Sequence, residues 1–152
     1  MLRARIKDSL KEAMKSKDKR KLSTLRLIIA TLQDRDLAAR DKGADEGISD
    51  DEILQMLTTM VRQRKDSIAA YEKGGRIDLA AAEQEEIDII SEYLPKQFDE
   101  GETREAVSKT IEDIDAAGLK DMGRTMAELK SKYAGRMDFS KASAIVKEML
   151  GA

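Results

Sequence analysis

The sequence predicts an all-α protein, and three observations support this fold class. Charged residues make up 38% of the chain and aromatic residues only 3%, which together with abundant Ala, Leu and Met is a helical composition. Strand-forming residues are sparse, and no run of alternating Val, Ile or Thr occurs. Apolar residues instead recur at spacings of three and four, the pattern of amphipathic helices. We expect an N-terminal bundle of about four helices followed by a small tail of three helices.

The first two expected helices flank the most basic stretch of the chain. Helical spacing predicts the first helix from Leu2 to about Met14 and the second from Leu22 to about Leu37. Between them, the run KSKDKRK (15–21) is expected to be a connection. Two interpretations of this run remain open: a solvated connection, or a loop that contacts phosphate groups.

The third helix has a clear start signal after the polar loop DKGADEG (41–47). Ser49 can cap the free amides while the Glu52 side chain reaches back to it. Ile48 can also pack onto Ile53 as a hydrophobic staple. The inward residues of this helix are expected to be Ile53, Leu57, Met60, Ile68 and Tyr71.

Arg64 falls on the same inward face, so we expect a buried stem and a head that reaches water. The glycine pair in EKGGR (72–76) ends the helix. Asp78 is then expected to cap a fourth helix, which Pro95 stops. The acidic outer residues of this helix, expected to be a solvated face rather than a cation site, are Glu83, Glu85, Glu86 and Asp88.

The segment KQFDEGET (96–103) is the predicted linker, because it follows the only proline and holds a glycine and three acids. This places an N-terminal helical domain at 1–96 and a C-terminal three-helix domain at 97–152. The second domain is small, and we expect it to be marginally stable by itself.

Start and stop signals divide this tail into three helices. The first is expected to end at Gly118, and Asp121 can cap the next. Gly135 terminates that sixth helix, and Asp138 can cap the last one. The residues expected in the core from the sixth helix are Met122, Met126, Leu129 and Tyr133.

Several kinds of chemistry are excluded by composition. The chain has no cysteine and no histidine, so disulfides, thiolate sites, and Ser–His or Cys–His catalysis are absent. Neither GxGxxG nor GxxxxGK[ST] occurs. We therefore assign no catalytic residue, no metal ligand and no cofactor, and expect no independent enzyme. No targeting or membrane-spanning segment is visible, which predicts a cytoplasmic protein without membrane contact.

Charge is distributed unevenly along the chain. Residues 1–42 hold 13 Lys/Arg against 6 Asp/Glu, a net of +7, whereas residues 43–152 hold 15 against 24, a net of −9. This separation indicates either an anionic partner at one end or a dipolar surface that pairs with itself. Aromatic side chains for base stacking are nearly absent, so any RNA contact would concern backbone and shape.

Several stretches taken together resemble one family. They are VRQRKDSIAAYEKGGRIDLAAAEQEEIDIISEYLPKQ (61–97), MGRTMAELK (122–130) and GRMD with VKEML after it (135–150). In this order and spacing they make essentially the whole chain similar to a YqeY-type protein of the GatB/YqeY group. The resemblance implies a helical N-terminal domain and a three-helix tail, joined just after YLPKQ.

The resemblance also carries a functional expectation. In the related B subunit of tRNA-dependent amidotransferases, a similar region follows a catalytic domain and helps to grip the tRNA. This implies a non-catalytic tRNA- or RNA-binding accessory module, with tRNA or a protein of the tRNA-amidation or translation machinery as partner. The relation to the B subunit could also carry over the label of carbon–nitrogen ligase activity with glutamine as amido-N-donor. No catalytic group is expected in this chain.

The candidate RNA contacts are the basic run and the surroundings of the sixth helix. They are Lys15, Lys17, Lys19, Arg20, Lys21, Lys120, Gly123, Arg124, Lys130, Lys132 and Arg136. Gly123 suggests a close approach, either of a neighbouring helix or of an RNA backbone, because glycine within a helix costs roughly 1 kcal/mol against alanine. The alternative function is a protein–protein adaptor that binds no RNA. The oligomeric state is not indicated.

Overall fold

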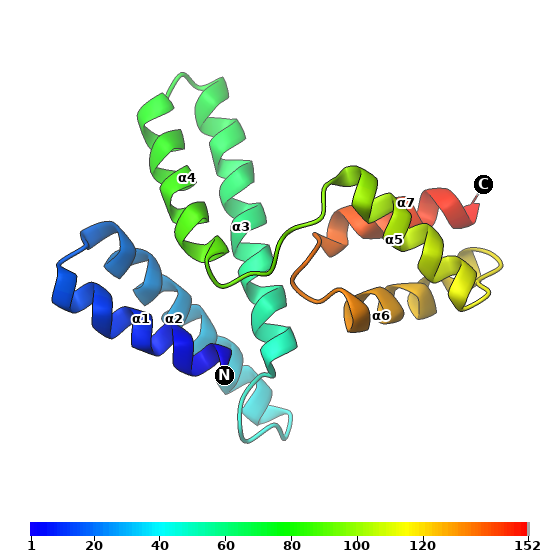
Figure 1. The fold of residues 1–152 in the computed structure, drawn as a ribbon, viewed down its shortest axis with the longest axis horizontal. Coiled ribbons are helices and arrows are strands. Elements are labelled where there is room, and N and C mark those ends of the chain that lie inside the picture. Colours follow the sequence, from blue (N-terminus) through cyan, green and yellow to red (C-terminus); the bar gives the residue numbers. More distant parts are fainter. Residues whose placement is uncertain (152) are drawn as a thin grey trace. The chain divides into compact units, whose positions relative to one another are not determined.

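The protein is all-α, as predicted. The computed structural model describes residues 1–151, and within them it contains seven α-helices, one short 3-10 helix and no strand (Figure 1). The elements are α1 (Leu2–Ser16), α2 (Lys19–Asp41), α3 (Asp50–Lys73), α4 (Ile77–Ser91), α5 (Glu100–Asp113), η1 (Leu119–Asp121), α6 (Met122–Lys132) and α7 (Phe139–Gly151). No helix in residues 1–151 is long and apolar enough to cross a membrane.

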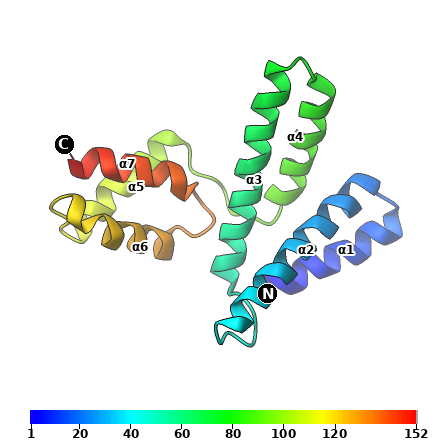
Figure 2. The same ribbon diagram turned by 180° about the vertical axis from the view of Figure 1, so that it is seen from behind.

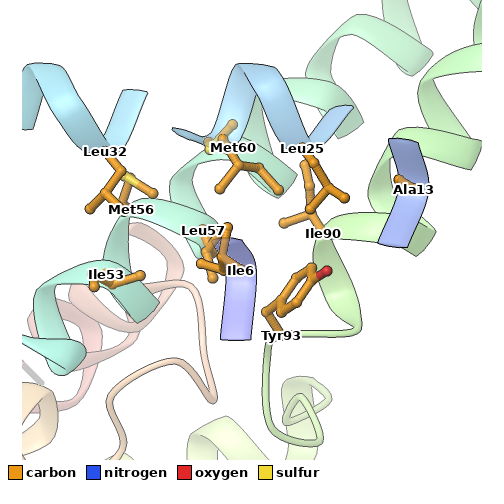
Figure 3. Packing of buried hydrophobic residues seen from close by; sticks show 11 residues of the cluster. Ile6, Ala13, Leu25, Leu32, Ile53, Met56, Leu57, Met60, Ile90 and Tyr93 are labelled. Carbon is orange, nitrogen blue, oxygen red and sulfur yellow. The ribbon is translucent and has the colours of Figure 1, made fainter. Parts of the chain in front are cut away.

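The chain divides into two compact units, Met1–Pro95 and Lys96–Ala152. In the first unit, α1 and α2 form an antiparallel pair, and so do α3 and α4 (Figures 1 and 2). Side chains from all four helices point toward one another in its core (Figure 3). The buried residues of this cluster are Ile6, Ala13, Leu25, Ile28, Leu32, Ile53, Met56, Leu57, Met60, Ile90 and Tyr93.

The basic run between α1 and α2 is mostly helical, so the predicted connection over 15–21 is wrong. Only Lys17 and Asp18 lie between the two helices. Lys17 adopts the left-handed conformation with φ 58°, and the Asp18 side chain accepts a hydrogen bond from the Lys21 amide. Because Asp18 caps α2 directly, and Lys and Arg are good helix formers, the basic residues extend both helices.

The start of α3 confirms the predicted capping box. The Ser49 side chain accepts from the Glu52 amide, and Glu52 accepts in turn from the Ser49 amide. The loop before α3 is fastened by Asp36, which pairs with Arg3 and accepts a hydrogen bond of 3.0 Å from the Ile48 amide. No local sequence pattern indicates this contact, because Arg3, Asp36 and Ile48 are far apart in the chain.

Arg64 does not extend to water, which corrects the predicted snorkelling. Its Nε donates to Glu86 Oε2 at 2.9 Å and its Nη1 to the Met60 carbonyl at 3.1 Å. Glu86 consequently turns toward α3 and is not part of a fully solvated face. The start of α4 also differs from the prediction, because Arg76 rather than Asp78 occupies the N-cap and Asp78 lies in the first turn.

Part of the predicted linker over 96–103 is the beginning of α5. Asp99 caps this helix in a second capping box with Glu102, so Glu100 and the residues after it are helical. The first tail helix also ends earlier than predicted, at Asp113 rather than Gly118. Asp115 then adopts a positive φ of 53° in the turn that follows.

The second unit has its own core between α5, α6 and α7. Its buried residues are Ala106, Val107, Leu129, Met137, Ala142, Ile145 and Val146. Met122, Met126 and Tyr133 pack against this cluster, as predicted. Asp138 accepts a hydrogen bond of 2.9 Å from the Ser140 amide at the start of α7. Asp121 stands at the start of α6, but its side chain accepts from the Ala117 amide instead of capping the helix.

Candidate nucleic-acid interface

The predicted RNA contacts lie in two different units. The basic run 15–21 belongs to α1 and α2 of the first unit, whereas the residues from Lys120 to Arg136 surround α6 in the second. Within each set, some side chains form ion pairs or hydrogen bonds with other residues of the fold, and others do not.

Two of the basic residues of α2 are engaged with α4. Arg20 Nε lies 3.0 Å from Glu85 Oε2, and its Nη1 lies 4.0 Å from Glu86 Oε1. Lys21 Nζ lies 3.4 Å from Glu92 Oε2. The acidic side of α4 and its C-cap residue Glu92 therefore neutralise part of the basic run. The periodicity of neither helix indicates these ion pairs.

The other three residues of the run are lysines without a partner in the described part of the chain. Lys15, Lys17 and Lys19 are all exposed around the α1–α2 turn. Asp18, between them, uses a side-chain oxygen to cap α2. Exposed ammonium groups in this arrangement can contact an anion without first breaking an ion pair.

In the second unit, three of the predicted cations are engaged within the fold. Arg124 Nη1 donates a hydrogen bond of 2.7 Å to the Ile114 carbonyl oxygen. Its Nη2 lies 3.3 Å from Asp121 Oδ1. Lys132 Nζ lies 3.3 Å from Glu128 and 3.7 Å from Asp113. The hydrogen bond with Glu128 is the main reason that the pKa of Lys132 is raised above its ordinary value.

Arg136 also has a structural role, at the entry of the second unit. Its guanidinium lies 4.5 Å from the centre of the Phe98 ring, and its Nε donates to the Lys96 carbonyl at 3.4 Å. The Phe98 amide donates to the Arg136 carbonyl at 2.7 Å, and the Phe98 ring packs on Tyr133 with centroids 5.5 Å apart. These contacts fasten the start of the unit to the loop between α6 and α7.

The outer side of α6 remains open. Lys130 of α6 is exposed and has no partner among residues 1–151. Lys120, in η1 just before α6, is exposed and makes no ion pair within 4 Å there, although its charge helps to lower the pKa of Asp121. A Cβ placed on Gly123 would meet no atom within 4 Å. The predicted close approach of a neighbouring helix is therefore wrong, and an approach by RNA stays a prediction.

The described residues contain no group of three or more acidic, His or Cys side chains that could hold a metal ion. Aromatic rings are largely occupied by the cores: Tyr93 is 3% exposed, and Phe98 and Tyr133 contact each other. Such rings are not available as platforms for unstacked bases.

These features define a small helical protein of two units with unpaired lysines on its surface. A family model described as "Yqey-like protein" matches residues 3–150, so the chain belongs to the YqeY-like protein family. This confirms the resemblance to YqeY-type proteins, whereas the relation to amidotransferases stays a prediction.

Curated relatives were found in yeasts. The protein "Altered inheritance of mitochondria protein 41, mitochondrial" of Vanderwaltozyma polyspora is 36% identical over 89 residues, covering 59% of this chain and 46% of that protein. Its namesakes in Saccharomyces cerevisiae and Kluyveromyces lactis are also 36% identical, with the same coverage. The matched region is thus less than half of these relatives. Since they are named as mitochondrial proteins, the cytoplasmic prediction is contradicted.

Proposed function

We propose that this protein is a non-catalytic accessory protein that binds the backbone of a structured RNA, with tRNA as the first candidate. The observation that carries the proposal is the outer side of α6, where Gly123 is open and Lys130 has no partner within residues 1–151, with the exposed Lys120 of η1 directly before it. Lysines contribute to RNA binding by displacing counterions from phosphates. A glycine without neighbours allows the helix backbone to approach a phosphate chain closely.

The position of the aromatic side chains favours a folded RNA over an unstacked strand. Binding of single strands relies on exposed rings, on which successive bases stack. Here Tyr93, Phe98 and Tyr133 are engaged in the two cores. Contacts of lysine with the backbone of an RNA helix need no such rings.

The proposal is tested by gel shift or filter binding of the purified chain with tRNA over a salt series. Lys120→Ala and Lys130→Ala should each weaken binding, and each should reduce the salt slope by about 0.7–0.9 for every phosphate that the lysine neutralises. Lys109→Ala is the matched control, because Lys109 is an exposed lysine on α5 of the same unit. Failure of the chain to bind tRNA at low salt, even at micromolar concentration, would rule the proposal out.

Substitutions at Gly123 separate helix stability from RNA contact. Gly123→Ala should raise the stability of the second unit by about 0.5–1 kcal/mol, since the helix is exposed there and the methyl group meets nothing. Gly123→Met is also a good helix former but projects a long side chain. It should keep the thermal stability and lower tRNA affinity, and unchanged affinity would exclude this side of α6 from the contact.

A protein–protein adaptor is the second candidate, and exposed apolar side chains favour it. Ile77 at the α3–α4 turn is 74% exposed, and Leu119 in η1 is 52% exposed. Pull-down from extract with and without RNase distinguishes the two functions. Partners that persist after RNase treatment support the adaptor, whereas partners that vanish support RNA binding.

A further inference from the structure

The side of α2 that faces away from the core has an unusual arrangement of charged and apolar side chains. Leu25, Ile28 and Leu32 point into the first unit's core. On the opposite side, residues three or four apart form a continuous seam along the helix. This outer seam consists of Lys19, Ser23, Arg26, Ala30, Asp34, Leu37 and Asp41, all of them exposed. Leu37 is 59% exposed, and Leu27 beside the seam is 45% exposed.

The charges of the outer seam are placed symmetrically about Ala30. Arg26 and Asp34 are equally far from Ala30 on either side, and so are Lys19 and Asp41. The basic residue of each pair precedes Ala30, and the acidic residue follows it. None of these four charged side chains has a partner elsewhere in the described residues, although neighbouring Arg20 is paired with Glu85.

We propose that two copies of this chain pair through the outer seam, with their α2 helices antiparallel and Ala30 at the crossing point. An antiparallel copy centred there has Asp34 opposite Arg26 and Asp41 opposite Lys19. Two-fold symmetry repeats each pair, which gives four opposite-charge contacts. Any other occupant would have to match this charge order, whereas a second copy matches it by symmetry. Dimerisation through the outer seam does not require RNA binding.

Packing is compatible with this arrangement. Ala30 is the middle residue of the outer seam and has its smallest side chain, so the two helix backbones can approach each other there. In the same register Leu37 lies opposite Ser23 of the second copy, and Leu27, beside the outer seam, is level with the second copy's Gln33. The two exposed leucines of each copy are then removed from water, which is favourable.

The helix dipole adds a further physical reason. Lys19 is in the first turn of α2 and Asp41 in the last, and each is the charge that its own helix end disfavours. In an antiparallel pair, Lys19 lies at the carboxyl end of the other α2 and Asp41 at its amino end. Each charge is then close to an opposite helix end as well as to an opposite side chain. Lys19 would serve this contact, which leaves Lys15 and Lys17 for RNA.

The test is sedimentation equilibrium of the full chain at low salt, from micromolar to several hundred micromolar. A concentration-dependent dimer is expected, and it should weaken as salt is added. Arg26→Glu brings two pairs of like charges together, and so does Asp34→Arg. Each single variant should dimerise about tenfold or more weakly than the natural chain.

Mixing the variants gives the decisive measurement. In a mixture of Arg26→Glu with Asp34→Arg, both exchanged contacts again join opposite charges, so a mixed dimer should form where neither variant dimerises well alone. The double variant R26E/D34R should pair with itself and not with the natural chain. Circular dichroism checks that every variant remains helical.

Lys65→Glu and Asp66→Arg are the control variants, because they reverse exposed charges on α3, away from the outer seam. Both should leave dimerisation unchanged. A natural chain that stays monomeric over the whole concentration range would overturn the proposal. So would a dimer insensitive to R26E and D34R, or single variants that fail to pair when mixed.

Discussion

Gly47, in the loop before α3, is a residue that the fold requires. Its φ of 86° is in the left-handed region, and a Cβ there would collide with the Asp36 carboxylate. Gly47→Ala should therefore lower the free energy of unfolding of the first unit by about 1–3 kcal/mol, as measured by urea titration.

Gly43→Ala is the matched control for this substitution. Gly43 also has a positive φ, of 95°, but a Cβ there would meet no atom within 4 Å. Gly43→Ala should therefore lower the free energy of unfolding only by the cost of the backbone conformation. Equal losses in the two variants would mean that crowding at Asp36 is unimportant.

Asp36 should make the stability of the first unit depend on pH in the acid range. The hydrogen bond from Arg3 is the main cause that lowers the pKa of Asp36, and the Ile48 amide adds to it against the opposing effect of burial. Because the folded state has the lower pKa, the stabilisation is fully present above about pH 4 and is lost as pH falls through the folded pKa.

This pH dependence can be measured by urea unfolding between pH 2 and pH 6. Asp36→Asn should remove the part of the pH dependence that Asp36 contributes. Asp66→Asn is the control, since Asp66 is an exposed acid on α3 without a partner in the described residues. If D36N and D66N give the same pH profile, the contact with Arg3 does not contribute.

Among the helices, α3 and α4 are joined by a charge pair with little access to water. The side chain of Arg64 is 10% exposed and that of Glu86 is 23% exposed. Glu86→Gln would leave the guanidinium largely buried without its carboxylate, which we expect to cost about 2–3 kcal/mol of unfolding free energy. Thermal unfolding followed by circular dichroism measures the loss.

Two further variants identify the cause of that loss. Glu85→Gln removes a more exposed contact with Arg20 and should cost less than about 1 kcal/mol. Replacing both partners, in Arg64→Met with Glu86→Leu, should recover much of the stability because no charge is left buried. A double variant less stable than Glu86→Gln would show that the pair itself stabilises the fold.

At the scale of the helices, local signals predicted most of the organisation. Apolar spacing located the seven α-helices but not the short η1, and the capping box of Ser49 and Glu52 is formed as expected. The errors occurred where two local signals compete. Asp99 caps α5 within the predicted linker, and Asp18 restarts a helix within the predicted connection, because a cap residue in a polar segment resembles a loop residue.

For the whole molecule, two separate cores lead to a prediction about fragments. A fragment of residues 1–95 contains the complete first cluster and should unfold cooperatively when heated. A fragment of residues 96–152 has a smaller core and should be helical but melt at a lower temperature. Circular dichroism of the two fragments tests this, and a first fragment without cooperative melting would contradict it.

The candidate site could be predicted only in part, for a physical reason. The sequence shows which residues are basic. It does not show which of these residues remain without an oppositely charged partner in the folded protein. Arg20 is neutralised by Glu85, and Arg136 is engaged by Phe98. Both contacts join residues that are distant in the chain, so no local pattern indicates them.

The sequence by itself therefore determined the all-α class, the approximate place of each α-helix and the family, because periodicity and caps act over a few residues. Only the tertiary structure decided that Arg64 is paired rather than solvated, that Gly123 is open, and that the charged outer seam of α2 has no partner within residues 1–151. Those features depend on how the helices pack. Packing brings together side chains whose separation in the chain hides their contact.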